Sequence, residues 1–281
     1  MAYTKLTPRH TTGANVEVVS SGSAYRLSIP AGSAKKYRLA QLDDYTKTPR
    51  RRFPLRAPIR LSLSARASSK SIPGTWGFGF WNDPFGLSLG FGGNPFRLPA
   101  LPNAVWFFGA SVESFLSFRE PRAERKTEHS LLRPQSERAA SSPPNTGGSA
   151  QHEIVANGFL AQSFRSPKFH PLLILAGLAL PFSRKLTRRL LGRVIDEDGF
   201  RLSVDVTQWH RYRLEWREAR VSFEVDDALV FESSVSPNPT LGLVIWLDNQ
   251  YAAFTPEGKI GFGVLENPDP AWLEIRDLAI G

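Results

Sequence analysis

The stretch GTWGFGFWNDPFG, residues 74–86, places five aromatic residues and four glycines in thirteen positions. In an extended strand, successive side chains point to opposite faces. One face therefore carries Trp76, Phe78 and Phe80, and the other carries Gly77, Gly79 and Trp81. Glycines in a strand are typical of a bulge or of a place that another backbone or a ligand approaches closely. We expect the aromatic face to lie in a core and the glycine face to form the floor of a cleft.

Short β-rich runs separated by Gly, Pro, Ser and Asn lie on both sides of this stretch, among them NVEVV, IRLSLSARA and LGLVIWLDNQY. Many short strands with turn signals between them are typical of an antiparallel sandwich or barrel. The chain has 281 residues, of which 41% are hydrophobic and seven are tryptophan, enough for a substantial core. The sequence therefore predicts an all-β protein with a single domain over residues 1–281.

Two segments interrupt the β pattern. Residues 119–153 contain almost no aliphatic side chains and are rich in Ser, Pro, Arg and Glu, so we expect a disordered insertion there. Residues 155–195 have the chain's only helical character and predict a helical, basic amphipathic insertion. The apolar run from Leu172 to Phe182 is eleven residues long, too short to span a bilayer alone.

Apolar residues recur every four positions at the end of this second insertion, at Phe182, Leu186, Leu190 and Val194. Between them lie five cations: Arg184, Lys185, Arg188, Arg189 and Arg193. One interpretation is a helix that packs on a sheet and keeps its cations in water. The alternative is a helix that attaches the protein to an anionic membrane surface.

The net charge of +9 is concentrated in two segments, residues 35–70 with +9 and residues 184–193 with +5, so the remainder is net acidic. This distribution argues against a nucleic-acid partner, which would require one coherent basic surface. The chain has no cysteine, which excludes disulfides and thiolate metal sites. Because its first residues lack the apolar run of a signal peptide, we expect a cytoplasmic protein, with peripheral membrane attachment as an option.

The segment WHRYRLEWREARVSFEVDDALVFESS, residues 209–234, resembles the concanavalin A-like lectin and glucanase superfamily, in particular glycoside hydrolase family sixteen. The matching positions here are Trp209, His210, Tyr212, Trp216, Phe223, Val225 and Asp226. Asp226 and Asp227, between the strand patterns VSFEV and ALVFE, predict a hairpin turn. Asp227 stands where the family has a glycine, which weakens the match at that turn. The family's tryptophan-rich strand is matched by Gly74, Trp76, Phe80 and Trp81.

This resemblance implies a two-sheet antiparallel jelly-roll sandwich whose concave face carries the ligand cleft. The family hydrolyses β-glucans with a Glu-x-Asp-x-x-Glu motif on the strand after the tryptophan-rich one, which supplies two carboxyl groups about 5 Å apart. Here the corresponding segment is LPNAVWFFGASVESFLSF, residues 101–118, whose only acid is Glu113. The resemblance therefore predicts the family's fold without its catalytic pair.

Two polar and aromatic segments, FWNDPFG and VIWLDNQY, are the best candidates for a ligand site. If both line one cleft, aromatic faces and amide groups would converge there, as in sites for sugars and other polar ligands. The candidate ligand-binding residues are Trp81, Asn82, Trp106, Trp246, Asn249, Gln250 and Tyr251. The candidate carboxylates are Asp83 and Asp248. Turn formation is the alternative explanation, since Asn-Asp-Pro and Asp-Asn favour turns.

These patterns favour a protein that binds a glycan, a glycolipid or another amphipathic small molecule without hydrolysing it. A second hypothesis is a hydrolase, lyase or isomerase that uses Asp83 and Asp248, and a third is a membrane-surface protein that docks through the basic helix. The sequence contains no phosphate loop, no His-Glu-x-x-His and no Gly-x-Ser-x-Gly. We therefore expect no cofactor and no metal cluster, and leave open a calcium ion bound by backbone oxygens.

Overall fold

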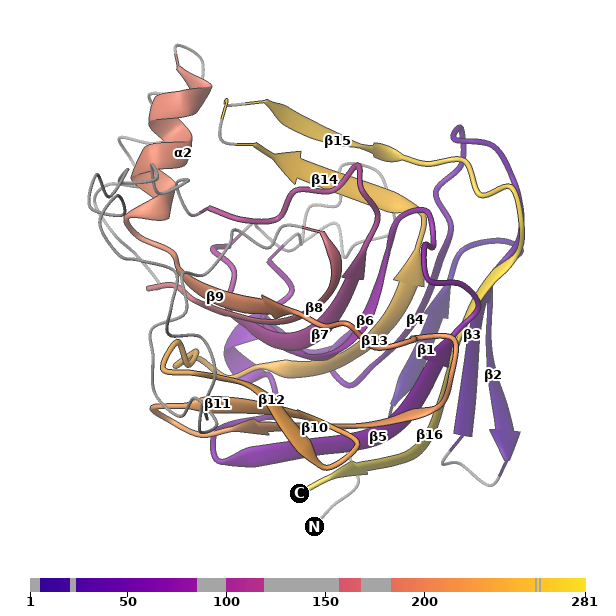
Figure 1. Ribbon diagram of the computed structural model, residues 1–281, viewed down its shortest axis with the longest axis horizontal. Helices are drawn as coiled ribbons and strands as arrows, with labels where there is room; N and C mark the ends of the chain where they lie inside the picture. Colours follow the sequence, from indigo (N-terminus) through magenta and orange to yellow (C-terminus); the bar gives the residue numbers. More distant parts are fainter. Residues whose placement is uncertain are drawn as a thin grey trace, which may run out of the picture.

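The computed structural model describes residues 6–20, 24–84, 100–118, 157–167, 183–255, 257 and 259–281. Two antiparallel sheets of seven strands each lie face to face (Figure 1). The front sheet has the order β1 (Thr7–His10), β4 (Leu39–Asp43), β13 (Gly242–Asp248), β6 (Thr75–Trp81), β7 (Ala104–Ala110), β8 (Gly158–Arg165) and β9 (Asp196–Arg201). The back sheet has the order β12 (Ala228–Ser233), β11 (Val221–Val225), β10 (His210–Trp216), β5 (Ile59–Ala67), β16 (Ala271–Ile280), β3 (Ala24–Ile29) and β2 (Asn15–Ser20). The predicted all-β class and two-sheet jelly-roll sandwich are confirmed.

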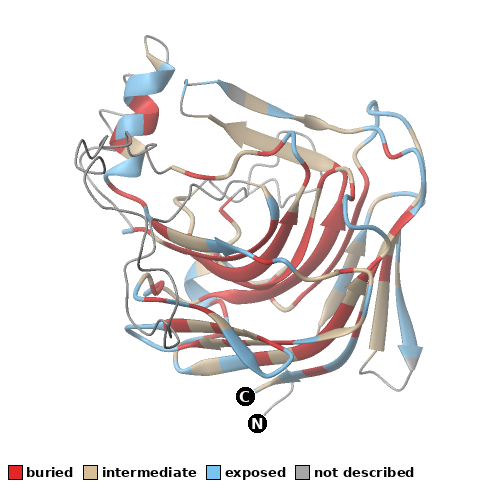
Figure 2. Ribbon diagram, viewed as in Figure 1, coloured by how far each residue is buried: buried red, intermediate tan, exposed pale blue. Residues whose placement is uncertain are grey.

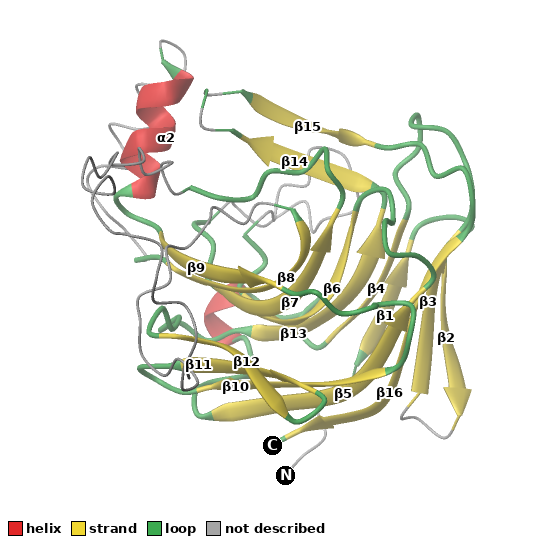
Figure 3. Ribbon diagram, viewed as in Figure 1, coloured by secondary structure: helices red, strands yellow, loops and turns green. Residues whose placement is uncertain are grey.

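The remaining elements are a hairpin of β14 (Gln250–Phe254) and β15 (Ile260–Val264), the helix α2 (Arg184–Gly192) and the short 3₁₀ helix η1 (Arg50–Arg52). The hairpin and α2 lie beside the face of the front sheet that is turned away from the back sheet (Figure 3). We call this face the outer face. Among the described residues, no helix is long and apolar enough to cross a membrane.

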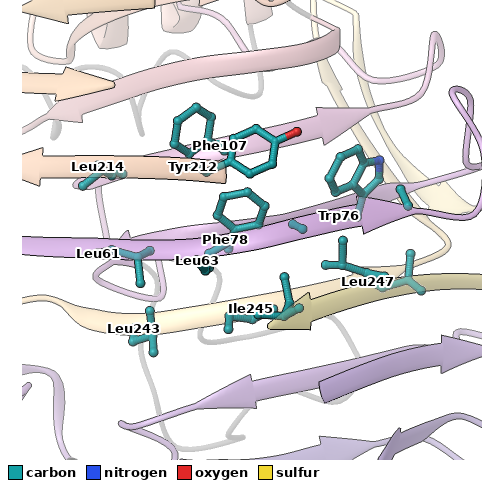
Figure 4. Packing of buried hydrophobic residues seen from close by; sticks show 14 of the residues in the cluster. Leu61, Leu63, Trp76, Phe78, Phe107, Tyr212, Leu214, Leu243, Ile245 and Leu247 are labelled. Carbon is teal, nitrogen blue, oxygen red and sulfur yellow. The ribbon is translucent and has the colours of Figure 1, made fainter. Parts of the chain in front are cut away.

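The core between the sheets contains the aromatic face of β6, as predicted. Trp76, Phe78 and Phe80 are 4%, 0% and 0% exposed, and Figure 2 shows how burial concentrates along these central strands. Phe78 lies edge-on to Tyr212 of β10, with ring centroids 5.1 Å apart, so the aromatic rings join the two sheets. Leucines of β5 and β13 complete this part of the core (Figure 4).

The predicted hairpin at Asp226 and Asp227 is also confirmed, because these residues join β11 to β12. Both have positive φ angles, +50° and +66°. Aspartate tolerates this left-handed conformation better than most residues, and two such residues give the twist that a tight hairpin requires. The departure from the glycine of the resembling family therefore leaves the turn intact.

The helical insertion predicted for residues 155–195 is wrong in its first part. Gly158–Arg165 forms β8, which pairs with β7 on one side and β9 on the other. Its sequence GFLAQSFR lacks clear alternation because both faces of the strand are buried, and such runs do not distinguish strand from helix. Helix is found in the described part of this segment only at α2. The predicted disordered insertion, residues 119–153, lies outside the described residues, as do residues 168–182.

Candidate functional site

Three tryptophans from neighbouring strands meet on the outer face. Trp246 of β13 stacks parallel to Trp81 of β6, with an interplanar angle of 2° and ring centroids 6.1 Å apart. Trp106 of β7 lies 5.5 Å from Trp246 and 5.9 Å from Trp81. The antiparallel registers bring these distant residues together, because Trp246 is opposite Gly77 and Trp106 is opposite Gly79. We call the three rings the tryptophan cluster.

The glycine face of β6 is occupied by this cluster. A Cβ atom on Gly77 would lie 2.9 Å from a ring carbon of Trp246, and one on Gly79 would lie 2.6 Å from the Cβ of Trp106. Both would also collide with carbonyl oxygens of β7. The glycines are therefore required by the protein's own tryptophans and strands, and they do not form the bare floor of a cleft that the sequence suggested.

Each indole nitrogen of the cluster donates a hydrogen bond inside the protein. Trp246 donates to Thr75 Oγ1 at 3.0 Å, Trp106 to Gln162 Oε1 at 3.2 Å and Trp81 to the Tyr45 hydroxyl at 2.6 Å. Buried indoles usually need such a partner. The partners come from β6, β8 and the segment after β4, so the cluster is oriented by hydrogen bonds around its edge.

The three rings of the tryptophan cluster differ in solvent exposure. Trp106 is 3% exposed and Trp246 is 6% exposed, whereas Trp81 is only partly buried. Leu116 and Phe118 from the segment after β7, and Leu191 from α2, pack on the same apolar cluster. Of the three rings, Trp81 is thus the most accessible in this conformation, and Trp106 and Trp246 are buried.

The carboxylate of Asp248 lies at the end of β13 beside the cluster. Its Oδ1 accepts hydrogen bonds from the backbone and hydroxyl of Thr75 and from the backbone of Gln250, and its Oδ2 accepts one from Tyr37. Burial nevertheless raises the pKa of Asp248 from its ordinary value of 3.8 to about 7. The Asp248 carboxyl group thus fixes the end of β13 and orients the Thr75 hydroxyl, which accepts the hydrogen bond from Trp246.

The structure does not bring Asp83 and Asp248 together. Asp248 is opposite Thr75 in the register of β13 and β6, whereas Asp83 lies beyond the other end of β6. At about 3.3 Å per strand residue, the two side chains are roughly 20 Å or more apart. Acid–base catalysis on one glycosidic bond requires about 5–10 Å, so this spacing does not fit their use as a pair.

The side-chain amides of two candidate ligand-binding residues form hydrogen bonds with backbone groups of the protein. Asn249 is fully buried, accepts a hydrogen bond from the Arg38 nitrogen and donates to the carbonyls of Lys36 and Leu265. Asn82 accepts from the Asn103 nitrogen at 3.0 Å and donates to the Leu101 carbonyl at 2.8 Å. The side-chain hydrogen bonds of both residues therefore join segments that are distant in the sequence.

Gln250 and Tyr251 begin β14, and both side chains are half-buried. The ring of Tyr251 lies over Gly263 of β15, where a Cβ would come within 2.6 Å of it. This side-chain packing orients the hairpin strand that follows Asp248 in the chain. Asp248 and Asn249, the other candidates of the same segment, form the hydrogen bonds within the protein that are described above.

A hydrogen-bonded cluster of polar side chains on the outer face was not predicted from the sequence. Gln41 and Asp43 of β4 point to this face and are bonded to each other at 2.8 Å, and Gln41 also donates to the Tyr45 hydroxyl at 3.2 Å. The buried carboxylate of Asp43 accepts hydrogen bonds from the backbone of Tyr45 and Thr46. The sequence signal was weak, since QLDDY reads as an ordinary strand end with a turn.

Asp44 follows in the same turn. Its Oδ1 accepts a hydrogen bond from the Leu243 nitrogen at 2.9 Å, while its Oδ2 is buried without a hydrogen-bond partner. Burial raises the pKa of Asp44 from 3.8 to about 7. Asp44 and Asp248 are thus two carboxyl groups whose pKa is raised to about 7.

β7 lies within residues 101–118, the segment in which the resemblance placed the family's catalytic motif. Its outer-face residues are Ala104, Trp106, Phe108 and Ala110, so no carboxylate from this strand reaches the outer face. Phe108 stacks on Trp106, with ring centroids 5.2 Å apart.

One residue of the predicted cationic face of α2, Arg188, does not lie on the exposed side of the helix. Arg188 is completely buried, and it donates hydrogen bonds to the carbonyls of Ser117 and Phe254. Leu186, predicted on the apolar side, is 44% exposed. Arg184, Lys185, Arg189 and Arg193 are exposed. The helix thus packs on the protein through a face that includes one cation and leaves four cations outside.

No group of three or more His, Asp or Glu side chains that could hold a metal ion is present among the described residues. His210, the first residue of β10, is engaged with Asp226 at 2.6 Å and with the carbonyl of Asp205 at 3.1 Å. These contacts place it in a loop-anchoring role on the back sheet, away from the tryptophan cluster.

No protein-family model and no curated protein sequence matches the chain. Solved structures with a similar chain path include a glycoside hydrolase family 16 endo-glucanase from Bacteroides ovatus, with 9% identity and a TM-score of 0.48, covering 100% of this chain and 96% of that one. A legume lectin-like domain from Entamoeba histolytica has 7% identity and a TM-score of 0.45, covering 98% and 89%. A sialidase has 7% identity and a TM-score of 0.42; the match covers 98% of this chain but only 17% of the sialidase. Because these likenesses are weak, the fold described above rests on the strand order and registers.

Proposed function

We propose that this protein binds a carbohydrate, or an amphipathic molecule that carries one, at the outer face of the front sheet without hydrolysing it. The observation that supports this proposal is the tryptophan cluster, in which Trp81 is partly exposed and stacked on Trp246. An indole offers a flat apolar surface to the C–H face of a sugar or to an acyl chain, and binding sites combine such surfaces with a few polar groups.

The ligand would meet Trp81 first, because the other two rings of the cluster are covered. Asp83 follows Trp81 by two residues and is itself partly exposed, so a polar group lies close to the accessible ring. Deeper entry would require side chains of the surrounding apolar cluster to move, because Trp106 and Trp246 are buried. An amphipathic ligand suits this arrangement, since its apolar part can replace the covering side chains.

The positions of the candidate carboxylates support a binding role without hydrolysis. β7 presents aromatic and small residues to the outer face. Asp248 is committed to Thr75, Gln250 and Tyr37, and it is far from Asp83 along the β6–β13 pair. Asp83 and Asp248 therefore do not form a pair of carboxyl groups at the separation that glycoside cleavage requires.

The test is calorimetric titration of the purified protein with β-glucan oligosaccharides, other oligosaccharides and alkyl glycosides. A ligand that binds should lose about threefold to tenfold in affinity in Trp81→Ala, which removes the accessible ring. Trp272→Ala is the matched control, because Trp272 is a partly buried tryptophan on the back sheet.

Two results would contradict the proposal. One is equal loss of affinity in Trp81→Ala and Trp272→Ala, which would indicate general destabilisation. The other is release of reducing sugar by the wild type that Asp83→Asn and Asp248→Asn each abolish, which would make the protein an enzyme.

A further inference from the structure

The exposed side of α2 carries an excess of positive charge. The helix buries Thr187, Arg188 and Leu190, and its opposite side presents Lys185, Arg189 and Arg193, with Arg184 exposed at the first turn. No ion pair joins these four cations to an acid in the described part of the chain. The helix itself contains no acidic residue, so its exposed side is uniformly basic.

The cations of the first turn do not serve the stability of the helix. Arg184 and Lys185 lie in this turn, which has no acidic residue, and cations near a helix N-terminus oppose the helix dipole, whereas Arg189 and Arg193 at the C-terminal end interact favourably with it. The tertiary attachment of α2 is made by its other side, where Arg188 binds the carbonyls of Ser117 and Phe254. The placement of Arg184 and Lys185 is therefore unfavourable for the helix itself and requires another explanation.

Exposed apolar side chains lie at the same end of the molecule. Leu186 of α2 is 44% exposed, and Phe262 of β15 is 51% exposed. The hairpin adjoins the helix, because Arg188 bonds to Phe254, which pairs with Ile260 two residues before Phe262 (Figure 1). In the hairpin turn, the exposed Glu257 is offset by Lys259, so the surface remains net positive.

We propose that the exposed side of α2, formed by Lys185, Leu186, Arg189 and Arg193 with Arg184 at its first turn, docks on an anionic lipid bilayer. A membrane surface supplies many negative headgroups in one plane, and each nearby lysine or arginine is attracted to it. The exposed Leu186 side chain among the cations can enter the headgroup layer, as in interfacial helices. The helix lies on the membrane while its buried side stays packed on the protein. This proposal is independent of the ligand at the tryptophan cluster.

The experiment is co-sedimentation of the whole protein with phosphatidylcholine vesicles that contain phosphatidylserine, compared with vesicles of phosphatidylcholine alone. We expect binding only to the anionic vesicles, and weaker binding as salt is raised because screening reduces the attraction. The variant Lys185→Gln, Arg189→Gln, Arg193→Gln should bind about a hundredfold more weakly, at about fivefold per cation. Leu186→Ser should also reduce binding at unchanged charge.

The matched control is Arg51→Gln, Arg52→Gln, Arg56→Gln, which removes the same charge from exposed positions elsewhere on the protein. It should sediment nearly as the wild type does. Equal losses in both triple variants would show that net charge alone drives binding and would overturn the proposal. So would wild-type binding in the helix variant, or retention on heparin beads without any vesicle binding, which would indicate a soluble polyanion instead.

Discussion

Thr75 and Asp248 lie opposite each other across β6 and β13, and Asp248 Oδ1 accepts hydrogen bonds from both the hydroxyl of Thr75 at 2.8 Å and its backbone nitrogen at 3.2 Å. The same hydroxyl oxygen accepts a hydrogen bond from the indole of Trp246. A buried carboxyl group, a strand end and one ring of the tryptophan cluster are thus linked through one threonine. Changes at Asp248 should consequently affect both stability and the environment of Trp246.

The first prediction concerns pH. Burial raises the pKa of Asp248 to about 7 from 3.8, so the folded protein keeps a proton that the unfolded chain releases between these values. The free energy of unfolding should therefore fall as pH rises from about 4 to about 7, by up to about 4 kcal/mol for this group. Asp248→Asn keeps the acceptor oxygen and cannot ionise, so it should reduce this pH dependence and stabilise the protein above pH 7.

Urea unfolding at several pH values measures this effect. Part of the pH dependence should survive in Asp248→Asn, because Asp44 has a similarly raised pKa. Asp205→Asn is the control: hydrogen bonds from Thr207 and Lys70 lower the pKa of Asp205 to about 2, outside this window. An Asp248→Asn protein with the full wild-type slope would show that the carboxyl group is ionised in the fold.

The second prediction concerns the attachment of α2. Arg188→Met should destabilise the protein by about 2–3 kcal/mol, because it leaves two carbonyl groups without their charged donor. Arg189→Met, one residue further along the exposed side, should change stability by less than about 0.5 kcal/mol. Hydrogen exchange should show faster opening of α2 only in the first variant, and similar protection in both would contradict the buried role of Arg188.

The third prediction concerns the glycine face of β6. Gly77→Ala should destabilise the protein by about 1–3 kcal/mol or more, since the added methyl group meets the Phe107 carbonyl at 2.3 Å and the ring of Trp246 at 2.9 Å. Gly199→Ala is the matched strand control, because its nearest neighbour, Gln162 Cγ, is 3.3 Å away and can shift. Thermal unfolding should separate the two variants, and equal melting temperatures would contradict the close packing of Trp246 on β6.

The fourth prediction concerns the accessible ring of the cluster. Tyr45→Phe removes the oxygen that accepts from Trp81 and that is bonded to Gln41, at a cost of about 1 kcal/mol for each lost bond. Trp81 should then become more mobile, and its fluorescence should be quenched more readily by acrylamide. Unchanged quenching would mean that ring stacking alone holds Trp81 in place.

The sequence by itself determined the sandwich and one of the two faces of its central strand. Alternation of large aromatic residues with glycine in GTWGFGFW requires an extended strand with one buried face, and the structure buries Trp76, Phe78 and Phe80 accordingly. The two adjacent aspartates at 226 and 227 similarly indicated a hairpin, because turn formation depends on local backbone preferences. Such features are readable from neighbouring residues alone.

Only the tertiary structure decided what occupies the other face of that strand. The rings that cover Gly77 and Gly79 come from Trp246 and Trp106, which are distant in the sequence and arrive through strand register. The same applies to Arg188, whose burial depends on carbonyl groups of two other segments. Asp83 and Asp248 resemble each other in their local motifs, yet the antiparallel pairing of β6 and β13 places them at opposite ends of the sheet. Long-range pairing sets which side chains meet, and a local pattern carries no information about it.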